Sequence, residues 1–191
     1  MGTPKADRPL LELGSATEWH DWLAANHATS DGAWLALAKK HSGAAAPTYE
    51  EAVEEALCWG WIDTTARRLD AERYLGLFTP RKRDGTWARS NRERVERLTA
   101  EGRMQPAGAA VIDAAKASGA WTLLEESEAH LMPDDLTAAL AANDRAAAGF
   151  AALPGSAKEM ALYWIATAKR VETRARRITA TVAAAAEGRA P

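Results

Sequence analysis

The chain has 191 residues, of which 47% are hydrophobic and 26% are charged, and its formal net charge at pH 7 is −2. This composition is typical of a folded globular protein, and it excludes a collagen-like chain, wholesale disorder and a membrane channel. The single cysteine, Cys58, excludes an internal disulfide and a zinc site built from several cysteines.

The N-terminal stretch lacks the apolar segment that a secretory signal requires. The longest apolar runs, such as Val182–Ala186, are far shorter than the roughly 20 residues of a membrane-spanning helix. We therefore expect no membrane span. A lone cysteine fits a reducing compartment, so we expect a cytoplasmic protein.

The starts of several helices are marked by the pattern Ser/Thr-x-x-Glu ahead of an apolar run. In this capping box the hydroxyl accepts a hydrogen bond from a free backbone N–H, while the Glu side chain reaches back to the cap. The pattern occurs at Ser15–Glu18, Thr48–Glu51, Ser90–Glu93 and Ser156–Glu159. A further helix is predicted from Pro106 to Gly119, and from Pro133 onward the apolar spacing predicts only helices.

Three short segments have the apolar and aromatic content of strands, namely Ala33–Lys39, Trp61–Thr65 and Tyr74–Thr79. The second and third are expected to pair across a turn at residues 68–71. The predicted fold is α+β: a small two- or three-stranded antiparallel sheet covered by helices, followed by a helical C-terminal module. We expect an α+β domain over residues 1–128 and the helical module over residues 129–191, with residues 120–132 as the linker.

Charge alternates along the chain in four blocks. Residues 1–60 carry a net charge of −5, residues 61–103 of +4, residues 104–157 of −5 and residues 158–191 of +4. Two interpretations remain open. The blocks neutralise each other across the fold, or the two basic blocks converge on an anionic ligand.

Motifs for metals and nucleotides are missing. The four histidines form neither an HxxxH nor an HExxH pair, and no glycine-rich phosphate loop occurs. We therefore expect no metal site and no cofactor. Cys58 is expected to be a buried, inert thiol, because a reactive thiolate needs a cationic or helix-N-terminal setting.

The segment from Cys58 to Arg94 mixes tryptophans with charged residues and is the candidate site. One interpretation is structural, with the tryptophans in the core and the charges on a solvated face. The other is a pocket with an aromatic floor, arginines for a carboxylate or phosphate, and an acid for an amine. The candidate ligand-binding residues are Trp61, Asp63, Arg67, Arg73, Arg81, Trp87 and Asn91.

Part of this segment resembles a known family. EEALCWGWID (residues 54–63), RRLDAERY (67–74) and FTPRKRDGTWARSNRERVERLTAEGRM (78–104) are similar to the signature of the YdeI/OmpD-associated proteins, also called bacteriocin-protection proteins. The stretch from Pro154–Gly155 to ETRARRI (172–178) resembles the small helical C-terminal module of that family. A usual form of the first motif is Phe-Gly-Trp-Ile-Asp-Gly, and here Trp59 and Thr64 replace its first and last residues.

The resemblance implies a bacterial protein linked to tolerance of antimicrobial peptides, and it carries over no catalytic residue. Our leading hypothesis is a cytoplasmic, non-catalytic protein that binds a small anionic or zwitterionic ligand or a peptide. A second hypothesis is nucleic-acid binding through the two basic blocks. A third is an enzyme of unknown reaction with Asp63 or Glu72 as its acid or base.

Overall fold

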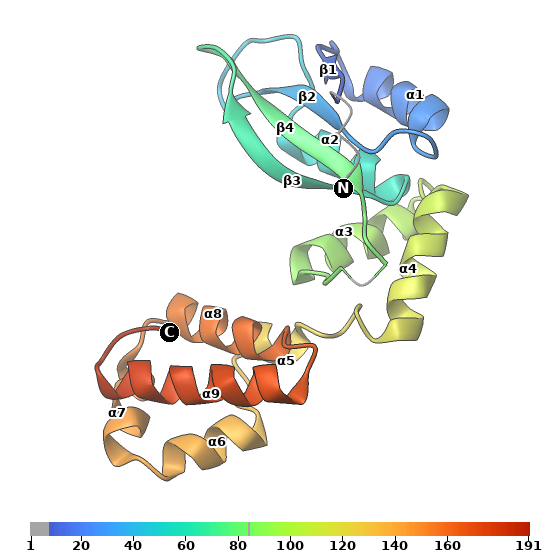
Figure 1. Ribbon diagram of the computed structural model, residues 1–191. Helices are drawn as coiled ribbons and strands as arrows, with labels where there is room; N and C mark the ends of the chain where they lie inside the picture. The colour runs from blue at the N-terminus through green and yellow to red at the C-terminus, as the bar shows by residue number, and fades with distance from the viewer. Residues whose placement is uncertain (1–7, 84) are drawn as a thin grey trace, which may run out of the picture. The chain divides into compact units, whose positions relative to one another are not determined.

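The computed structural model describes residues 8–83 and 85–191 (Figure 1). Residues 1–7, on which part of the expectation about a secretory signal rests, lie outside the described residues. The described chain forms two compact units. The first takes in the described residues up to Gly85 together with Ser90–Ala120, and the second takes in Thr86–Arg89 and Trp121–Pro191. No helix in the described ranges is long and apolar enough to cross a membrane.

The first unit is built on a four-stranded sheet with the strand order β1-β2-β4-β3. Its strands are β1 (Leu10–Leu11), β2 (Ala33–Ala38), β3 (Trp61–Arg68) and β4 (Arg73–Pro80). The predicted antiparallel pairing of the segments at residues 61–65 and 74–79 is confirmed. The predicted strand count was too low, because β1 adds to the sheet as a strand parallel to β2. Two residues are too few to show any periodicity, so the sequence carries no signal for β1.

The described part of this unit also holds four helices: α1 (Ala16–Asn26), α2 (Tyr49–Cys58), α3 (Arg89–Ala100, all but its first residue) and α4 (Pro106–Ser118). The predicted caps at Ser15 and Thr48 are confirmed, since each hydroxyl accepts from the backbone N–H three residues on. The cap predicted at Ser90 is wrong, because α3 already begins one residue earlier. α2 lies behind the sheet in Figure 1.

The core of the first unit lies between the sheet and helices α1 and α2. Trp19 of α1 is fully buried, and its ring packs against Trp61 of β3 and Phe78 of β4. Its indole N–H donates to the carbonyl of Ala52 on α2 at 3.1 Å, which ties the two helices together. Side chains alternate between the two faces of a strand, so Trp61 and Phe78 mark the face of the sheet that these helices cover.

A β-bulge interrupts β3 at Thr64. Asp63 is opposite Phe78 of β4 and Thr65 is opposite Leu77, so Thr64 has no partner of its own across the ladder. The Thr64 hydroxyl donates instead to the carbonyl of Leu77 at 3.2 Å. An extra residue reverses the in-and-out alternation of a strand. Asp63 therefore faces the helices, whereas Thr65 and the residues in step with it face the other way.

The second unit is helical, as predicted for the C-terminal module. Its helices are α5 (Glu125–Glu128), α6 (Asp134–Ala141), α7 (Asp144–Ala152), α8 (Gly155–Ala166) and α9 (Val171–Ala186). The cap predicted at Ser156 is wrong, because Pro154 occupies the N-cap position and places Ser156 inside α8. The core contains Leu136, Leu140, Phe150, Leu162, Ile165 and Ile178.

Candidate functional site

Trp61 of the candidate set is a core residue. It is 1% exposed, and its indole N–H donates to the carbonyl of His27 at 3.2 Å. Its ring meets Trp19 and Trp22 of α1 edge to face, with ring centroids 6.3 and 5.8 Å away. Trp61 therefore serves the packing of α1 on the sheet rather than an open cavity.

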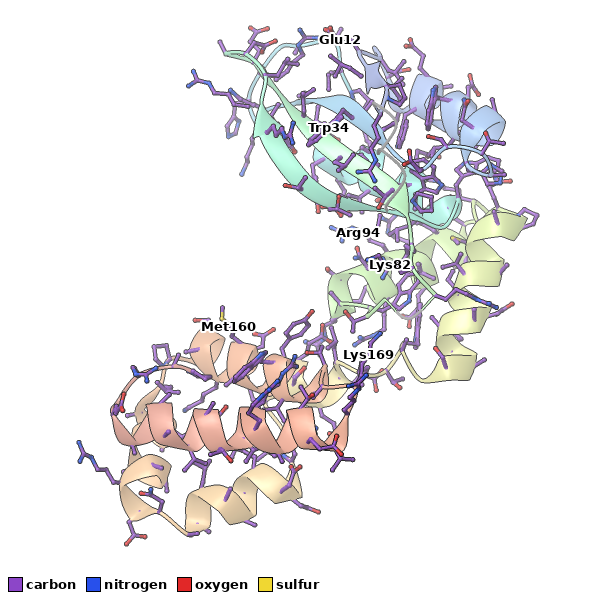
Figure 2. The ribbon with its side chains drawn as sticks, in the orientation of Figure 1. Glu12, Trp34, Lys82, Arg94, Met160 and Lys169 are labelled. Atoms are coloured by element: carbon purple, nitrogen blue, oxygen red, sulfur yellow. The ribbon has the colours of Figure 1, made fainter. Side chains whose placement is uncertain are left out.

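Arg67 and Arg73 face away from α1 and α2, on the other side of the sheet from Asp63. Arg67 follows the bulge, and its guanidinium lies 4.4 Å from the ring centroid of Trp34 on β2 (Figure 2). Arg73 is held by two carboxylates, with nitrogen–oxygen distances of 2.6 Å to Glu12 and 2.9 Å to Asp70. These two arginines therefore do not join Asp63 in one cavity.

Neither Trp87 nor Asn91 lines a pocket with Asp63. Trp87 is 1% exposed and belongs to the second unit, where its ring packs at 4.9 Å against Trp121. Asn91 lies on α3, and its side-chain oxygen accepts from Arg94 at 3.0 Å.

Asp63 lines a pocket of about 280 Å³ between the sheet and the first turn of α2. The phenolic O–H of Tyr49, the first residue of α2, donates to Asp63 Oδ2 at 3.1 Å. Among the described residues that line the pocket, Asp63 alone is charged. The others are Leu37, Tyr49, Thr64, Thr65, Ala66, Tyr74, Gly76 and Phe78.

Glycine at position 76 leaves room at the base of this pocket. A Cβ on Gly76 would stand 2.9 Å from Leu37 Cδ1 and 3.1 Å from Phe78 Cε2, closer than such atoms normally approach. A side chain at position 76 would therefore displace Leu37 or Phe78, both of which line the pocket.

The electrostatics around Asp63 involve two tyrosines and an arginine. Desolvation of the phenol, with the charge and hydrogen bond of Asp63 acting in the same direction, raises the pKa of Tyr49 to about 12. Desolvation and then the charge of Asp63 also raise the pKa of Tyr74. Burial lowers the pKa of Arg81 to about 10, and the negative charge of Asp63 opposes that shift. Among the candidate arginines, Arg81 is thus the one whose pKa the charge of Asp63 shifts.

Ion pairs link α2 to α3 and to Arg103, which follows α3. The charge blocks of the sequence did not indicate which residues would pair. Arg94 of α3 binds both carboxylate oxygens of Glu50, each at 2.7 Å (Figure 2). Glu54 pairs with Arg97, and Arg103 reaches Glu54 at 2.9 Å and Glu55 at 2.6 Å. The signal in the sequence was the spacing of Glu50 and Glu54 on one helical face, opposite a helix rich in arginine.

A larger cavity of about 490 Å³ lies within the second unit, and sequence reasoning missed it. Its walls come from α6, α7 and α8 and from the segment before α6. Its lining consists of His130, Met132, Leu140, Ala147, Phe150, Ala151, Gly155, Lys158 and Leu162. Its buried apolar residues, Leu140, Phe150 and Leu162, have the spacing of ordinary core residues of amphipathic helices, so the sequence pattern does not indicate a cavity.

Metal-ligating side chains do not gather anywhere in residues 8–83 and 85–191, where no three His, Cys, Asp or Glu residues form a group that could hold an ion. Cys58 is buried, and its pKa is raised to about 12 by desolvation, with Glu55 adding to the shift.

Comparison with protein families gives two matches along the chain. Residues 11–111, just over half of the chain, match a domain of unknown function, DUF8412. Residues 131–188 match the family described as "Bacteriocin-protection, YdeI or OmpD-Associated". The chain belongs to the DUF8412 family and carries a YdeI/OmpD-associated domain. The resemblance to the YdeI/OmpD-associated proteins is thereby confirmed over residues 131–188, whereas the motifs quoted from residues 54–104 fall in the DUF8412 match. No curated protein and no solved structure matches the chain.

The two matched regions of the chain hold the Asp63 pocket and the cavity of the second unit separately. The Asp63 pocket lies in the DUF8412 region, and all of the large cavity except His130 lies in the YdeI/OmpD-associated domain.

Proposed function

We propose that this YdeI/OmpD-associated protein is a non-catalytic binding protein whose Asp63 pocket holds the ammonium group of a small zwitterionic ligand or of a peptide. The observation that carries the proposal is a single carboxylate in a pocket of about 280 Å³ whose other described lining residues are uncharged. A carboxylate in such a setting attracts a cation, and two tyrosine rings beside it add cation–π attraction.

The hydrogen bond from Tyr49 supports a binding role over a proton-transfer role. With a pKa of about 12, the Tyr49 phenol keeps its proton at neutral pH and remains a donor to Asp63. The bond orients the Asp63 carboxylate in the pocket, where it can accept from the ammonium group of a ligand.

We extend the proposal to a zwitterionic ligand because Arg81, although outside the lining of the pocket, lies within electrostatic reach of Asp63. A purely anionic ligand has less support, since Arg67 and Arg73 face the other side of the sheet. The description of the family that matches residues 131–188 supports a link to tolerance of bacteriocins. We propose that the protein acts in the cytoplasm.

Three four-carbon probes test the proposal: butylamine, 4-aminobutyrate and butyrate. A ligand that binds only the folded state raises the unfolding midpoint by mass action. We expect the amine and the zwitterion to raise the midpoint and butyrate to leave it unchanged. Equal shifts from butyrate and butylamine would overturn the proposal.

Asp63→Asn locates the binding, because it removes the charge while keeping the shape of the side chain. We expect the affinity for butylamine to fall about tenfold or more. Asp21→Asn, at an exposed position on α1, is the matched control and should keep wild-type affinity. Turnover of 4-aminobutyrate that depends on Asp63 would instead support the enzyme hypothesis and contradict the non-catalytic role.

A further inference from the structure

The cavity in the second unit is apolar in its interior. Leu140, Phe150 and Leu162 are at most 5% exposed and form its inner wall, and Ala147 of α7 leaves open space beside them. A volume of about 490 Å³ falls within the range of roughly 300–1,000 Å³ that is usual for small-molecule sites. An interior without charged groups recognises an apolar body by burial rather than by hydrogen bonds.

The ionisable side chains that line this cavity are basic. Lys158 and His130 supply a cation and a titratable imidazole, and the lining includes no carboxylate side chain. The Lys158 ammonium is held at the edge, where it donates to the carbonyl of Ala151 at 2.7 Å. Glu159 pairs with His130 from outside the lining, with its Oε2 3.9 Å from His130 Nε2 and its side chain half exposed.

The backbone at the edge adds to this polarity. Gly155 lines the cavity as the first residue of α8, a helix whose first turn has no side-chain cap. A Cβ on Gly155 would meet only His130 Cε1, at 3.9 Å, so the glycine leaves the approach open. Helix N-termini carry partial positive charge, which reinforces the sign already set by Lys158.

We propose that this cavity binds a small amphiphile with an apolar chain and a carboxylate head. The chain fills the space bounded by Leu140, Phe150 and Leu162, and the carboxylate lies at the edge beside Lys158. An apolar interior with a cationic edge is complementary to an apolar body with an anionic end. The inference goes beyond the proposed function, because it concerns another unit and the opposite head-group charge.

Decanoate is the probe, and decylamine is its matched opposite with the same apolar chain. Carbon-13 labelling of the methionine methyl groups reports the location in combination with Ala147→Leu, because Met132 lines both this cavity and the pocket beside Arg174, whereas Met104 lies in the first unit. With the full chain and at concentrations below micelle formation, we expect decanoate to shift the Met132 resonance in a saturable way and to leave Met104 unchanged. Decylamine should shift Met132 at least about tenfold more weakly, as measured by half-saturation.

Substitutions at two positions distinguish recognition of the apolar chain from recognition of the carboxylate head. Ala147→Leu occupies the cavity and should abolish the saturable Met132 shift. Lys158→Met keeps most of the apolar stem and should weaken decanoate about tenfold, whereas Lys158→Arg should retain it. Arg145→Met removes one positive charge from an exposed position on α7 and is the control.

Equal half-saturation for decanoate and decylamine at Met132 would overturn the proposed head-group recognition. Unaltered binding in Ala147→Leu, or a shift of Met132 that never saturates, would overturn the site itself. Because the readout is Met132, these failures are distinct from a failure of amine binding at Asp63.

Discussion

At the scale of single residues, Tyr49 and Asp63 act as a pair. Tyr49 begins α2 and Asp63 precedes the bulge of β3, so two elements must be correctly placed for their hydrogen bond of 3.1 Å to form. The pair fixes the carboxylate in the pocket and keeps the phenol protonated.

Replacing Asp63 with Asn should lower the pKa of Tyr49. Desolvation of the phenol, then the charge of Asp63 and the hydrogen bond that Asp63 accepts, raise that pKa to about 12, and the variant keeps only the desolvation. Absorbance at alkaline pH, in a Tyr74→Phe background, should show one phenol titrating at lower pH in the variant. An unchanged titration curve would contradict the hydrogen-bonded pair.

The thiol of Cys58 should be inert in the folded protein. It is 1% exposed, and desolvation followed by the charge of Glu55 raises its pKa to about 12, so little thiolate exists at neutral pH. A thiol-specific reagent should react with the native protein only as fast as the first unit opens, and rapidly in denaturant. Fast stoichiometric labelling under native conditions would show that the packing around Cys58 is different.

At the scale of elements, α2 and α3 are joined by opposite charges. The acidic residues of α2 belong to the first acidic block of the sequence, and Arg94, Arg97 and Arg103 belong to the basic block that follows it. At this contact the blocks neutralise each other. Asp135 and Arg174 do the same between the last two blocks, with a nitrogen–oxygen distance of 2.7 Å. These pairings weaken the hypothesis that the basic blocks bind nucleic acid.

Arg94→Met should destabilise the first unit in a pH-dependent way. Hydrogen bonds from Arg94 lower the pKa of Glu50 below its usual 4.5, so the pair contributes stability above pH 4.5 and loses it as the pH falls through the lowered value. The loss at pH 7 should be about 0.5–1 kcal/mol, because Glu50 is half exposed and solvent screens the pair.

Denaturant unfolding at pH 7 and at pH 3 measures this difference, which should shrink at the lower pH. A double-mutant cycle with Glu50→Gln isolates the pair from the lost packing of Arg94. A loss that is equal at both pH values and unaltered by Glu50→Gln would show that the ion pair contributes nothing.

The elements that sequence patterns could predict are those with periodicity or capping residues. The α+β class, the antiparallel pairing of β3 with β4 and the helical second unit all follow from such signals. β1 could not be predicted, because it is held by backbone pairing with β2 rather than by its own two side chains. β3 also continues to Arg68, so Arg67 is a strand residue.

The candidate site could be predicted only in part, and the bulge at Thr64 is a main reason. Unbroken alternation from Trp61 would have placed Asp63 and Arg67 on the same face of the sheet. The extra residue separates them, and nothing in the local composition signals its presence. Tyr49, which donates a hydrogen bond to Asp63, lies on α2, outside the segment from Cys58 to Arg94 that supplied the candidate residues.

At the scale of the whole molecule, each unit contains a close approach of two helices at a glycine. A Cβ at Gly108 of α4 would overlap the carbonyl oxygen of Cys58 in the first unit. A Cβ at Gly149 of α7 would overlap the carbonyl oxygen of Ala185 on α9 in the second unit. In both cases the obstacle is backbone, which cannot rotate out of the way.

Gly108→Ala and Gly149→Ala should each destabilise its own unit by about 1–3 kcal/mol, although alanine normally favours a helix over glycine. Cys58 labelling in increasing denaturant reports the first unit, so Gly108→Ala should move that transition and Gly149→Ala should leave it in place. Gly155→Ala, which meets only one distant atom, is the control. Equal effects of the two variants on Cys58 would show that the units unfold together.

The unpaired residue at Thr64 decides which side chains the second half of β3 displays on each face. If Thr64 instead paired with Leu77 in an unbroken ladder, strict alternation would carry the downstream side chains, Arg67 among them, to the side now occupied by the helices. The guanidinium that rests on Trp34 would then have to enter the packed interior. Deletion of Thr64, in contrast, keeps Asp63 opposite Phe78 and Thr65 opposite Leu77, so relatives of this chain should tolerate the loss of this position better than a register that pairs it.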